Sequence, residues 1–234
     1  MDKGKLGVLG GMGPQATAVF YQRLIDHTLA TTDQEHLPML ILSDTQVPDR
    51  TAALLSEDTA EVEARLLADA KVLEGWGATA IAIPCNTSHA FLPRLQSKVS
   101  VPMVNMIEET AAALKASGAQ RVGILATDGT LRMGLYHAAL KKVGIEPVSP
   151  PPALQEFVMH LIYHQIKRGE RGNLEQMAAM DTAFRTMDCD RAVLACTELS
   201  VCKEWHHLSD FYLDAMDVLA DKCITLCGYP LRHP

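Results

Sequence analysis

The chain has 234 residues, enough for one or two domains, and a sizeable core can form because 48% of the residues are hydrophobic. Charged residues make up 21% and aromatic residues 5%, which excludes a disordered chain and favours helices on parallel sheets over an all-β sandwich. The formal net charge of −7, with no basic run longer than two residues, argues against nucleic acid or an anionic membrane as partner.

The first half of the chain alternates predicted strands and helices. Residues 6–10 predict a strand that ends in glycines, and Pro14 stands at the first position of the helix that follows. Later segments of this half predict strands at 38–43, 78–84 and 101–104, a polar loop at 44–51, a helix at 58–74 and another helix that ends at Gly118. The strand at 78–84 leads directly into Cys85-Asn86-Thr87.

The second half repeats this plan. Its predicted elements are a strand at 121–127, a helix that ends at Gly144, a strand at 145–148, helices at 154–168 and 173–187, and a strand at 191–195. The last of these strands leads into Cys196-Thr197-Glu198, just as the earlier one leads into Cys85. We therefore predict an α/β fold of two similar lobes, each a parallel sheet flanked by helices, related by a pseudo-twofold axis.

The repeat predicts where a ligand binds. Parallel sheets bind ligands at the carboxyl ends of their strands, so we expect one active site between the lobes, with Cys85 and Cys196 on opposite walls. Either cysteine alone could be a small buried apolar side chain. A helix beginning beside it would instead lower the pKa of the thiol, and the matching positions favour a functional pair.

The remaining cysteines fit a structural role. Six cysteines without regular spacing indicate free thiols in a reducing compartment. Cys189 and Cys202 follow no such strand, and Cys223 and Cys227, four residues apart on a predicted helix, lack a second pair of metal ligands. The start of the chain has no apolar signal-peptide core and no stretch approaches 18 apolar residues, so we expect a soluble, cytoplasmic protein.

Other patterns leave alternatives open. Residues 10–14 lack the spacing of a nucleotide loop, and a tight turn whose N–H groups face a small carboxylate is favoured. Arg50 is either a solvated charge in a loop or a residue that binds a carboxylate through two hydrogen bonds.

One helix face carries several groups with metal-binding chemistry. Glu156, His160, His164 and Lys167 share a face of the helix predicted at 154–168. They supply too few ligands for a metal without His-Glu-x-x-His, so we predict a polar helix face and no metal site.

Three segments resemble the signatures of the aspartate/glutamate racemase family. They are Gly-Val-Leu-Gly-Gly-Met-Gly-Pro-Gln-Ala-Thr at 7–17, Pro-Cys-Asn-Thr-Ser-His at 84–89 and Ala-Cys-Thr-Glu-Leu at 195–199. The resemblance covers essentially the whole chain, although position 195 is often glycine in relatives. It implies an amino-acid racemase that needs no pyridoxal phosphate or other cofactor, with two α/β lobes and usually a homodimer. The implied lobes are 1–116 and 117–208, with residues 209–234 packing back on the first lobe.

The resemblance also implies roles for individual residues. Cys85 and Cys196 would be the catalytic pair, with Cys196 serving the L form and Cys85 the D form. The implied substrate-binding residues are Met12, Arg50, Asn86, Thr87, Ser88, Thr127, Lys167, Thr197 and Glu198. Arg50 and Lys167 match the basic positions that hold the dicarboxylate in aspartate racemases, which favours an acidic substrate.

The chemistry of inversion agrees with two thiols. Inverting an α-carbon requires a base on one face and an acid on the other, and donors around the α-carboxylate must stabilise the carbanion. We therefore favour racemisation of aspartate over that of glutamate. The alternatives are a hydantoin racemase or decarboxylase of the same superfamily, a thiol hydrolase that pairs Cys85 with His89, and an amino-acid-binding module without catalysis.

Overall fold

A computed structural model of the chain describes residues 3–206 and 208–233. It contains two compact units: unit 1 is Met1–Met106 with Met216–Pro234, and unit 2 is Ile107–Ala215. The chain thus changes unit at Met106 and Ala215, whereas the predicted boundaries were 116 and 208. The difference arises because nearly all of helix α5 (Met106–Ala116) and strand β7 (Tyr212–Asp214) belong to unit 2.

Unit 1 is built on a three-stranded parallel sheet in the order β2-β1-β3. The strands are β1 (Leu6–Gly10), β2 (Met39–Ser43) and β3 (Ala80–Ala82), which confirms three predicted strands. The fourth, predicted at 101–104, is wrong: Met103 forms only an isolated bridge with Ile81. The ladder does not extend, because Pro102 has no N–H to donate on one side and the Met106 N–H on the other side donates to His89.

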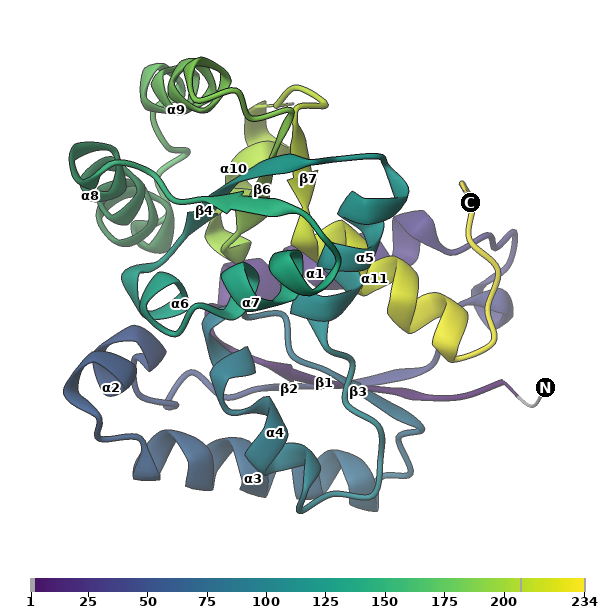
Figure 1. Cartoon of the computed structure of the whole chain (residues 1–234). Helices are drawn as coiled ribbons and strands as arrows, with labels where there is room; N and C mark the ends of the chain where they lie inside the picture. Colours follow the sequence, from purple (N-terminus) through teal and green to yellow (C-terminus); the bar gives the residue numbers. More distant parts are fainter. Residues whose placement is uncertain (1–2, 207, 234) are drawn as a thin grey trace. The chain divides into compact units, whose positions relative to one another are not determined.

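The helices of unit 1 cover both faces of this sheet. They are α1 (Pro14–His27), α2 (Arg50–Ser56), α3 (Ala60–Gly75), α4 (Leu92–Gln96) and α11 (Ala215–Leu226), with short 3₁₀ turns at η1 (Asp33–Glu35) and η2 (Thr87–Ala90). Figure 1 shows α3 and α4 on one face and α1 with α11 on the other. The predicted stripe Val62, Leu66, Ala70 and Leu73 is the buried side of α3.

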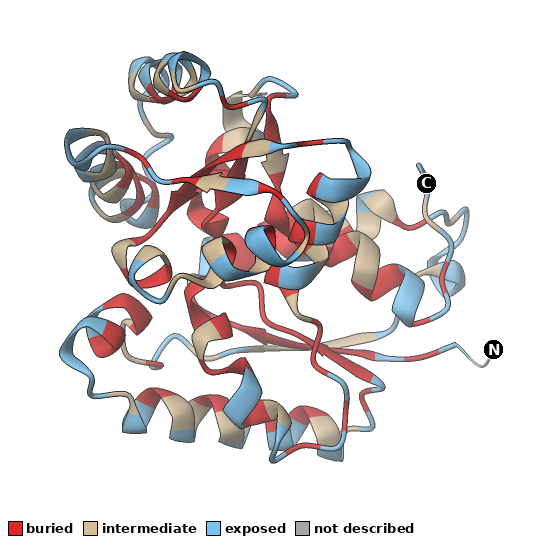
Figure 2. Ribbon diagram, in the orientation of Figure 1, coloured by how far each residue is buried: buried red, intermediate tan, exposed pale blue. Residues whose placement is uncertain are grey.

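Unit 2 is built on a four-stranded parallel sheet in the order β5-β4-β6-β7. Its strands are β4 (Arg121–Ala126), β5 (Glu146–Val148), β6 (Arg191–Ala195) and the unpredicted β7. Figure 2 shows that the central strands are almost wholly buried. Burial on both faces explains why they are continuous apolar runs rather than alternating ones.

The helices of unit 2 are α5, α6 (Asp128–Arg132), α7 (Leu135–Lys142), α8 (Pro152–His160), α9 (Leu174–Thr186) and α10 (Thr197–His206). The helix predicted at 154–168 changes type part-way: after α8 come a π turn, η3 (Leu161–Gln165), and a 3₁₀ turn, η4 (Ile166–Arg168). A π turn inserts about one extra residue, which rotates the following side chains by about 100°. Lys167 therefore no longer shares a face with His160 and His164.

Among the helices that the structure describes, none combines the length and the apolar character needed to cross a lipid bilayer.

Candidate active site

The predicted site residues of unit 1 meet at the carboxyl edge of its sheet. Met12 follows β1, Arg50 follows β2, and Cys85 to Ser88 follow β3. All of these side chains are buried. The Ser88 hydroxyl donates to the Met12 sulfur over 3.5 Å, which joins the loop after β1 to the loop after β3. Parallel pairing thus brings together residues that lie up to 76 positions apart.

The glycine-rich loop after β1 is a closed turn. Gly11 has φ +91°, and a Cβ at this position would lie 2.5 Å from the backbone of Asp44, so only glycine fits. The Gly11 N–H donates to Thr17 Oγ1 over 2.9 Å, and Thr17 Oγ1 donates in turn to the Gly13 carbonyl. The Gly11 N–H is therefore used within the turn, and the expectation that N–H groups of this turn face a carboxylate stays a prediction for the others.

The ring of His89 is fully committed to the backbone. Its Nδ1 lies 3.0 Å from the Cys85 carbonyl oxygen, and its Nε2 accepts from the Met106 N–H over 3.1 Å. This arrangement defines a neutral ring with the proton on Nδ1, and burial lowers the pKa of His89. Neither nitrogen is available to the Cys85 thiol, so the geometry offers no support for a Cys85–His89 hydrolase.

His89 predicts a pH dependence of stability. Unfolded histidine titrates near pH 6.5, and its pKa in the fold is lower. The unfolded chain therefore binds more protons as pH falls through about 6.5, and the free energy of unfolding decreases there. In urea unfolding, the gap between the wild-type and His89→Asn midpoints should be wider at about pH 7 than at about pH 5.

A second histidine of unit 1 supplies a control of opposite sign. The hydrogen bond from His27 to Asp221, 2.7 Å long, raises the pKa of His27. Its contribution is therefore present below about pH 6.5 and is lost as pH rises through the folded pKa. The difference between the wild-type and His27→Gln urea midpoints should be wider at about pH 5 than at about pH 7. The same pH trend in the His27 and His89 variants would contradict the pKa directions given for both histidines.

Arg50 is a buried side chain rather than a solvated loop charge. It is the first residue of α2, whose N-cap Asp49 accepts from the Ala52 N–H over 2.8 Å. The Arg50 Nη1 donates to the carbonyls of Val47 and Pro48, at 3.1 and 3.0 Å. These bonds fix the guanidinium in its own loop at the carboxyl edge of the sheet. A fixed guanidinium is suited to two-point binding of a carboxylate.

The predicted residues of unit 2 occupy the corresponding edge of the second sheet. Thr127 follows β4 and caps α6, accepting from the Thr130 N–H over 3.3 Å. Cys196, Thr197 and Glu198 follow β6, at the start of α10. Lys167 lies in η4, beyond β5, and its ammonium is 2.7 Å from Glu198 Oε1.

The thiol of Cys196 contacts the other oxygen of the same carboxylate. Cys196 Sγ lies 3.0 Å from Glu198 Oε2, and both side chains are buried. Burial first, and then the charge of Glu198, raise the pKa of Cys196 well above its ordinary value, while Lys167 opposes this only partly. A backbone hydrogen bond from Glu198, at the start of α10, lowers the pKa of this thiol as expected, but burial and the Glu198 carboxylate outweigh it. The pairing of Lys167 with Glu198 could not be predicted from a local pattern, because the two residues are 31 positions apart.

The remaining cysteines have surroundings typical of structural thiols. All six cysteines are free and buried. Cys223 and Cys227 lie in and just after α11. In the described ranges, 3–206 and 208–233, no group of three histidine, cysteine or acidic side chains is arranged to hold a metal ion.

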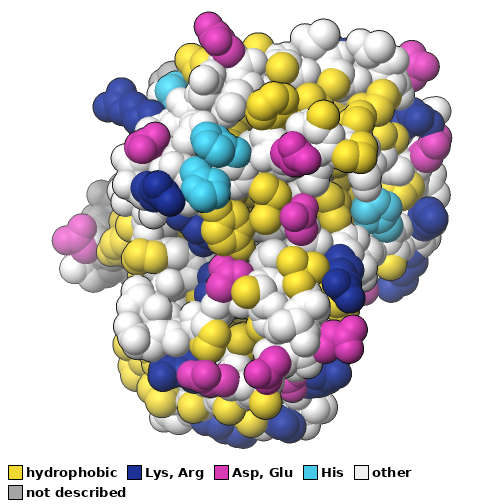
Figure 3. Space-filling model, turned by 90° about the vertical axis from the view of Figure 1, so that its left-hand side faces the viewer, with side chains coloured by type: hydrophobic (Ala, Val, Ile, Leu, Met, Phe, Trp, Pro, Cys, Tyr) yellow, Lys and Arg dark blue, Asp and Glu magenta, His cyan; other side chains and the backbone are white. Residues whose placement is uncertain are grey.

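The cavity beside α8 exposes mainly apolar surface. It has a volume of about 710 Å³ and is lined by Asp128, Pro152, Gln155, Glu156, Met159, His160, Tyr163, His164 and Arg168. His160 and His164 stack with ring centroids 5.2 Å apart. Figure 3 shows histidine side chains beside hydrophobic ones on the face that it presents. The predicted polar face of this helix is thus partly apolar, and Lys167 does not line the cavity.

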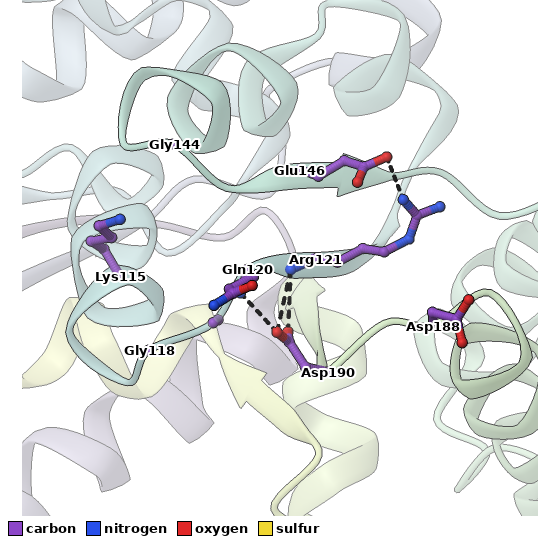
Figure 4. Close-up of a pocket in the computed structure, with 9 residues that line it drawn as sticks. Lys115, Gly118, Gln120, Arg121, Gly144, Glu146, Asp188 and Asp190 are labelled. Atoms are coloured by element: carbon purple, nitrogen blue, oxygen red, sulfur yellow. Dashed lines mark hydrogen bonds and ion pairs between the residues drawn. The ribbon is translucent and has the colours of Figure 1, made fainter.

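A more polar cavity of unit 2, about 790 Å³ in volume, lies at the amino ends of the strands (Figure 4). Its charges compensate one another: Arg121 pairs with Glu146, and Asp190 accepts from the backbone N–H groups of Gln120 and Arg121. These contacts tie β4 to β5 and to the segment before β6. The cavity lies at the opposite edge of the sheet from Cys196, which favours a structural role.

The two units share one strand plan. The central strand is β1 in one and β4 in the other, and it is flanked by β2 and β3 or by β5 and β6. The polar turns follow the same plan, since Arg50 and Lys167 come after β2 and β5, and the two cysteines come directly or nearly directly after β3 and β6. This correspondence confirms the expected α/β architecture of two parallel sheets flanked by helices.

The model of the Asp/Glu/hydantoin racemase family matches residues 9–223 of this chain. The chain belongs to that family. The match includes every residue named above for the carboxyl edges of the two sheets. The resemblance inferred from the three sequence segments is thereby confirmed.

Three known racemases are similar to this chain over different shares of its length. An aspartate racemase structure from Picrophilus torridus is 31% identical, with a TM-score of 0.84, covering 98% of this chain and 96% of that one. The broad specificity amino-acid racemase RacX of Bacillus subtilis (strain 168) is 32% identical over 61% of this chain. A glutamate racemase of Oceanobacillus iheyensis is 29% identical over 53% of this chain. The matched segments span only 63% and 45% of these two curated relatives.

Proposed function

We propose that the protein racemises an acidic amino acid, most specifically aspartate, by a two-base mechanism that needs no pyridoxal phosphate or other cofactor. The single observation that supports this best is the repeated placement of a buried free thiol at the carboxyl edge of two equivalent sheets. Cys85 and Cys196 would act on opposite faces of one substrate. This pairing gives a use to both thiols, which a hydrolase centred on Cys85 does not.

The proposed reaction needs only proton transfers. A thiolate on one side removes the α-proton, and the thiol on the other side returns a proton to the opposite face. The electron pair left on the α-carbon is stabilised by hydrogen-bond donors around the α-carboxylate. Asn86 and Thr197 directly follow the two cysteines in the sequence, and with Thr87, Ser88 and Thr127 they would supply such donors.

The preference for an acidic substrate rests on the two cations. Arg50 is a guanidinium fixed by its bonds to Val47 and Pro48, and a planar guanidinium matches the geometry of a carboxylate. Lys167 has three N–H donors, so it can hold Glu198 and a substrate carboxylate at once. The 31% identity to an aspartate racemase over nearly the whole chain also supports aspartate.

Relatives give two specific alternatives. The Bacillus subtilis relative is a broad specificity amino-acid racemase, and the Oceanobacillus iheyensis relative acts on glutamate by its name. A substrate panel separates them: purified protein is incubated without added cofactor with L-aspartate, L-glutamate, L-alanine and a 5-substituted hydantoin. Chiral chromatography then measures the opposite enantiomer. We expect conversion of aspartate well above the other three, and conversion of alanine at an equal rate would contradict recognition of the side-chain carboxylate.

We also propose that the enzyme is cytoplasmic and forms a homodimer. Six free thiols suit a reducing cytoplasm, and the family resemblance favours a homodimer. Light scattering on the purified protein measures the second directly.

A further inference from the structure

The neighbours of Cys196 form a short chain of contacts within unit 2. The thiol is 3.0 Å from one oxygen of Glu198, and the Lys167 ammonium is 2.7 Å from the other oxygen. An ionised carboxylate only accepts hydrogen bonds, so the thiol must be the donor in the first contact. The contact as it stands therefore requires a protonated Cys196.

We propose that Glu198 is the positioning residue for the proton of Cys196: its carboxylate accepts the S–H, Lys167 holds that carboxylate, and Cys196 enters the conversion of D-aspartate as the proton donor. This inference rests on the proposed function for its place in the reaction. It changes the expected role of Glu198 from a substrate ligand to a partner of the thiol. Lys167 acts on Cys196 through Glu198, whether or not it also holds a substrate carboxylate.

Because both side chains are buried, the thiol form of Cys196 is strongly favoured over the thiolate. Cys196 is 5% exposed, and the side chain of Glu198 is 7% exposed. A thiolate at this position would lie beside a carboxylate with little water to screen the repulsion. Beyond Glu198 on α10 and Lys167 on η4, the described neighbours of the thiol include the buried phenol of Tyr136 on α7, whose own pKa is raised by burial and which therefore stays neutral.

For D-aspartate the assignment sets the order of the two proton transfers, and L-aspartate is converted by the same steps in reverse, from a thiolate at Cys196 and a thiol at Cys85. The α C–H bond of the substrate breaks, its electron pair stays on carbon, and the proton goes to the thiolate of Cys85. The S–H bond of Cys196 then breaks and its proton forms the new C–H bond on the opposite face. Cys196 is left as a thiolate beside Glu198, and Lys167 offsets part of that repulsion. Exchange of protons with water resets both thiols, with no net gain or loss.

The test measures the protonation of Cys196 directly, without using turnover. Full-length protein is alkylated with iodoacetamide across a pH series, and peptide mass spectrometry follows residues 192–203, which contain Cys196 and Cys202. Only the thiolate reacts, so Glu198→Gln, which removes the charge and keeps the shape, should raise the Cys196 rate about tenfold or more near pH 8 and shift its pH profile to lower pH. Lys167→Met should have the opposite effect and slow the reaction.

The opposite changes expected in the Cys196 alkylation rate of Glu198→Gln and Lys167→Met distinguish an electrostatic effect from loosening of the fold. Burial raises the pKa of Cys202 to about 11 and this thiol has no partner role in the chain of contacts, so its labelling reports opening of unit 2. Glu198→Asp, which keeps the charge, should stay close to wild type. An unchanged Cys196 rate in Glu198→Gln would overturn the inference, and so would acceleration in both Glu198→Gln and Lys167→Met together with Cys202.

The outcome is separate from that of the proposed function. Aspartate racemisation is assayed on the same preparations. If the wild type does not racemise but Glu198→Gln accelerates labelling of Cys196, the proposed function fails while the protonation of Cys196 stands. If the wild type racemises and Glu198→Gln labels no faster, the inference fails alone.

Discussion

Replacing either Cys85 or Cys196 by alanine is expected to lower the racemisation of aspartate by about 10²–10⁴-fold, the usual contribution of a general acid or base. Each variant keeps one thiol and should therefore still exchange the α-hydrogen of one enantiomer with solvent. By the family resemblance, Cys85→Ala should exchange only L-aspartate and Cys196→Ala only D-aspartate. The measurement is proton NMR of each enantiomer in deuterated buffer.

The two exchange rates are not expected to be equal. Glu198 holds Cys196 in its protonated form, so exchange of the L form in Cys85→Ala should be the slower of the two. Cys189→Ala, which replaces a buried thiol at the opposite edge of the unit 2 sheet, is the matched control and should racemise normally. Undiminished racemisation in Cys85→Ala or Cys196→Ala would refute the two-base mechanism. Exchange of both enantiomers by one variant would instead make the missing thiol a bystander.

Replacing Arg50 by methionine is expected to reduce kcat/KM for aspartate by about a hundredfold, which corresponds to about 2.7 kcal/mol of lost binding in the transition state. The physical reason is the loss of a pre-organised two-point contact with a carboxylate. Arg50→Lys should recover little, because a point charge does not reproduce the planar fork. The measurement is initial-rate kinetics with aspartate and with alanine, since only the former has a second carboxylate.

Stability must be followed in the same variants. Arg50 also bonds to Val47 and Pro48, so Arg50→Met is expected to cost about 1–2 kcal/mol of unfolding free energy. Arg94→Met is the control, since among the contacts described this exposed guanidinium pairs only with Glu63 of α3. A normal aspartate rate in Arg50→Met would remove this residue from the site.

Much of the fold could be predicted from local patterns. Continuous apolar runs identified β1, β4 and β6, and the helical stripe ending at glycines identified α3. The patterns failed where pairing across the sheet decides the outcome. Residues 101–104 look like a strand but form one bridge, while the short segment Tyr212–Asp214 becomes β7 because it pairs with β6.

The candidate site could be predicted as a set of turns but not as a set of contacts. Strand ends indicated Cys85 and Cys196, since polar residues directly after apolar strands gather at one edge of a parallel sheet. The pairing of Lys167 with Glu198 depends on the π turn that precedes Lys167, and no local sequence pattern predicted this turn. The bonds from Arg50 to the carbonyls of Val47 and Pro48 are local, but no sequence pattern indicates them, and the second partner of His89 is the Met106 N–H, 17 positions away.

The central claim is that two different thiols serve the two faces of the α-carbon. The most direct test incubates wild-type protein with L-aspartate in deuterium oxide and follows both enantiomers from the first measurable conversion. We expect the newly formed D-aspartate to carry deuterium at the α-carbon while the remaining L-aspartate keeps its original hydrogen. Equal early deuteration of both enantiomers, which one base serving both faces would produce, would contradict the claim.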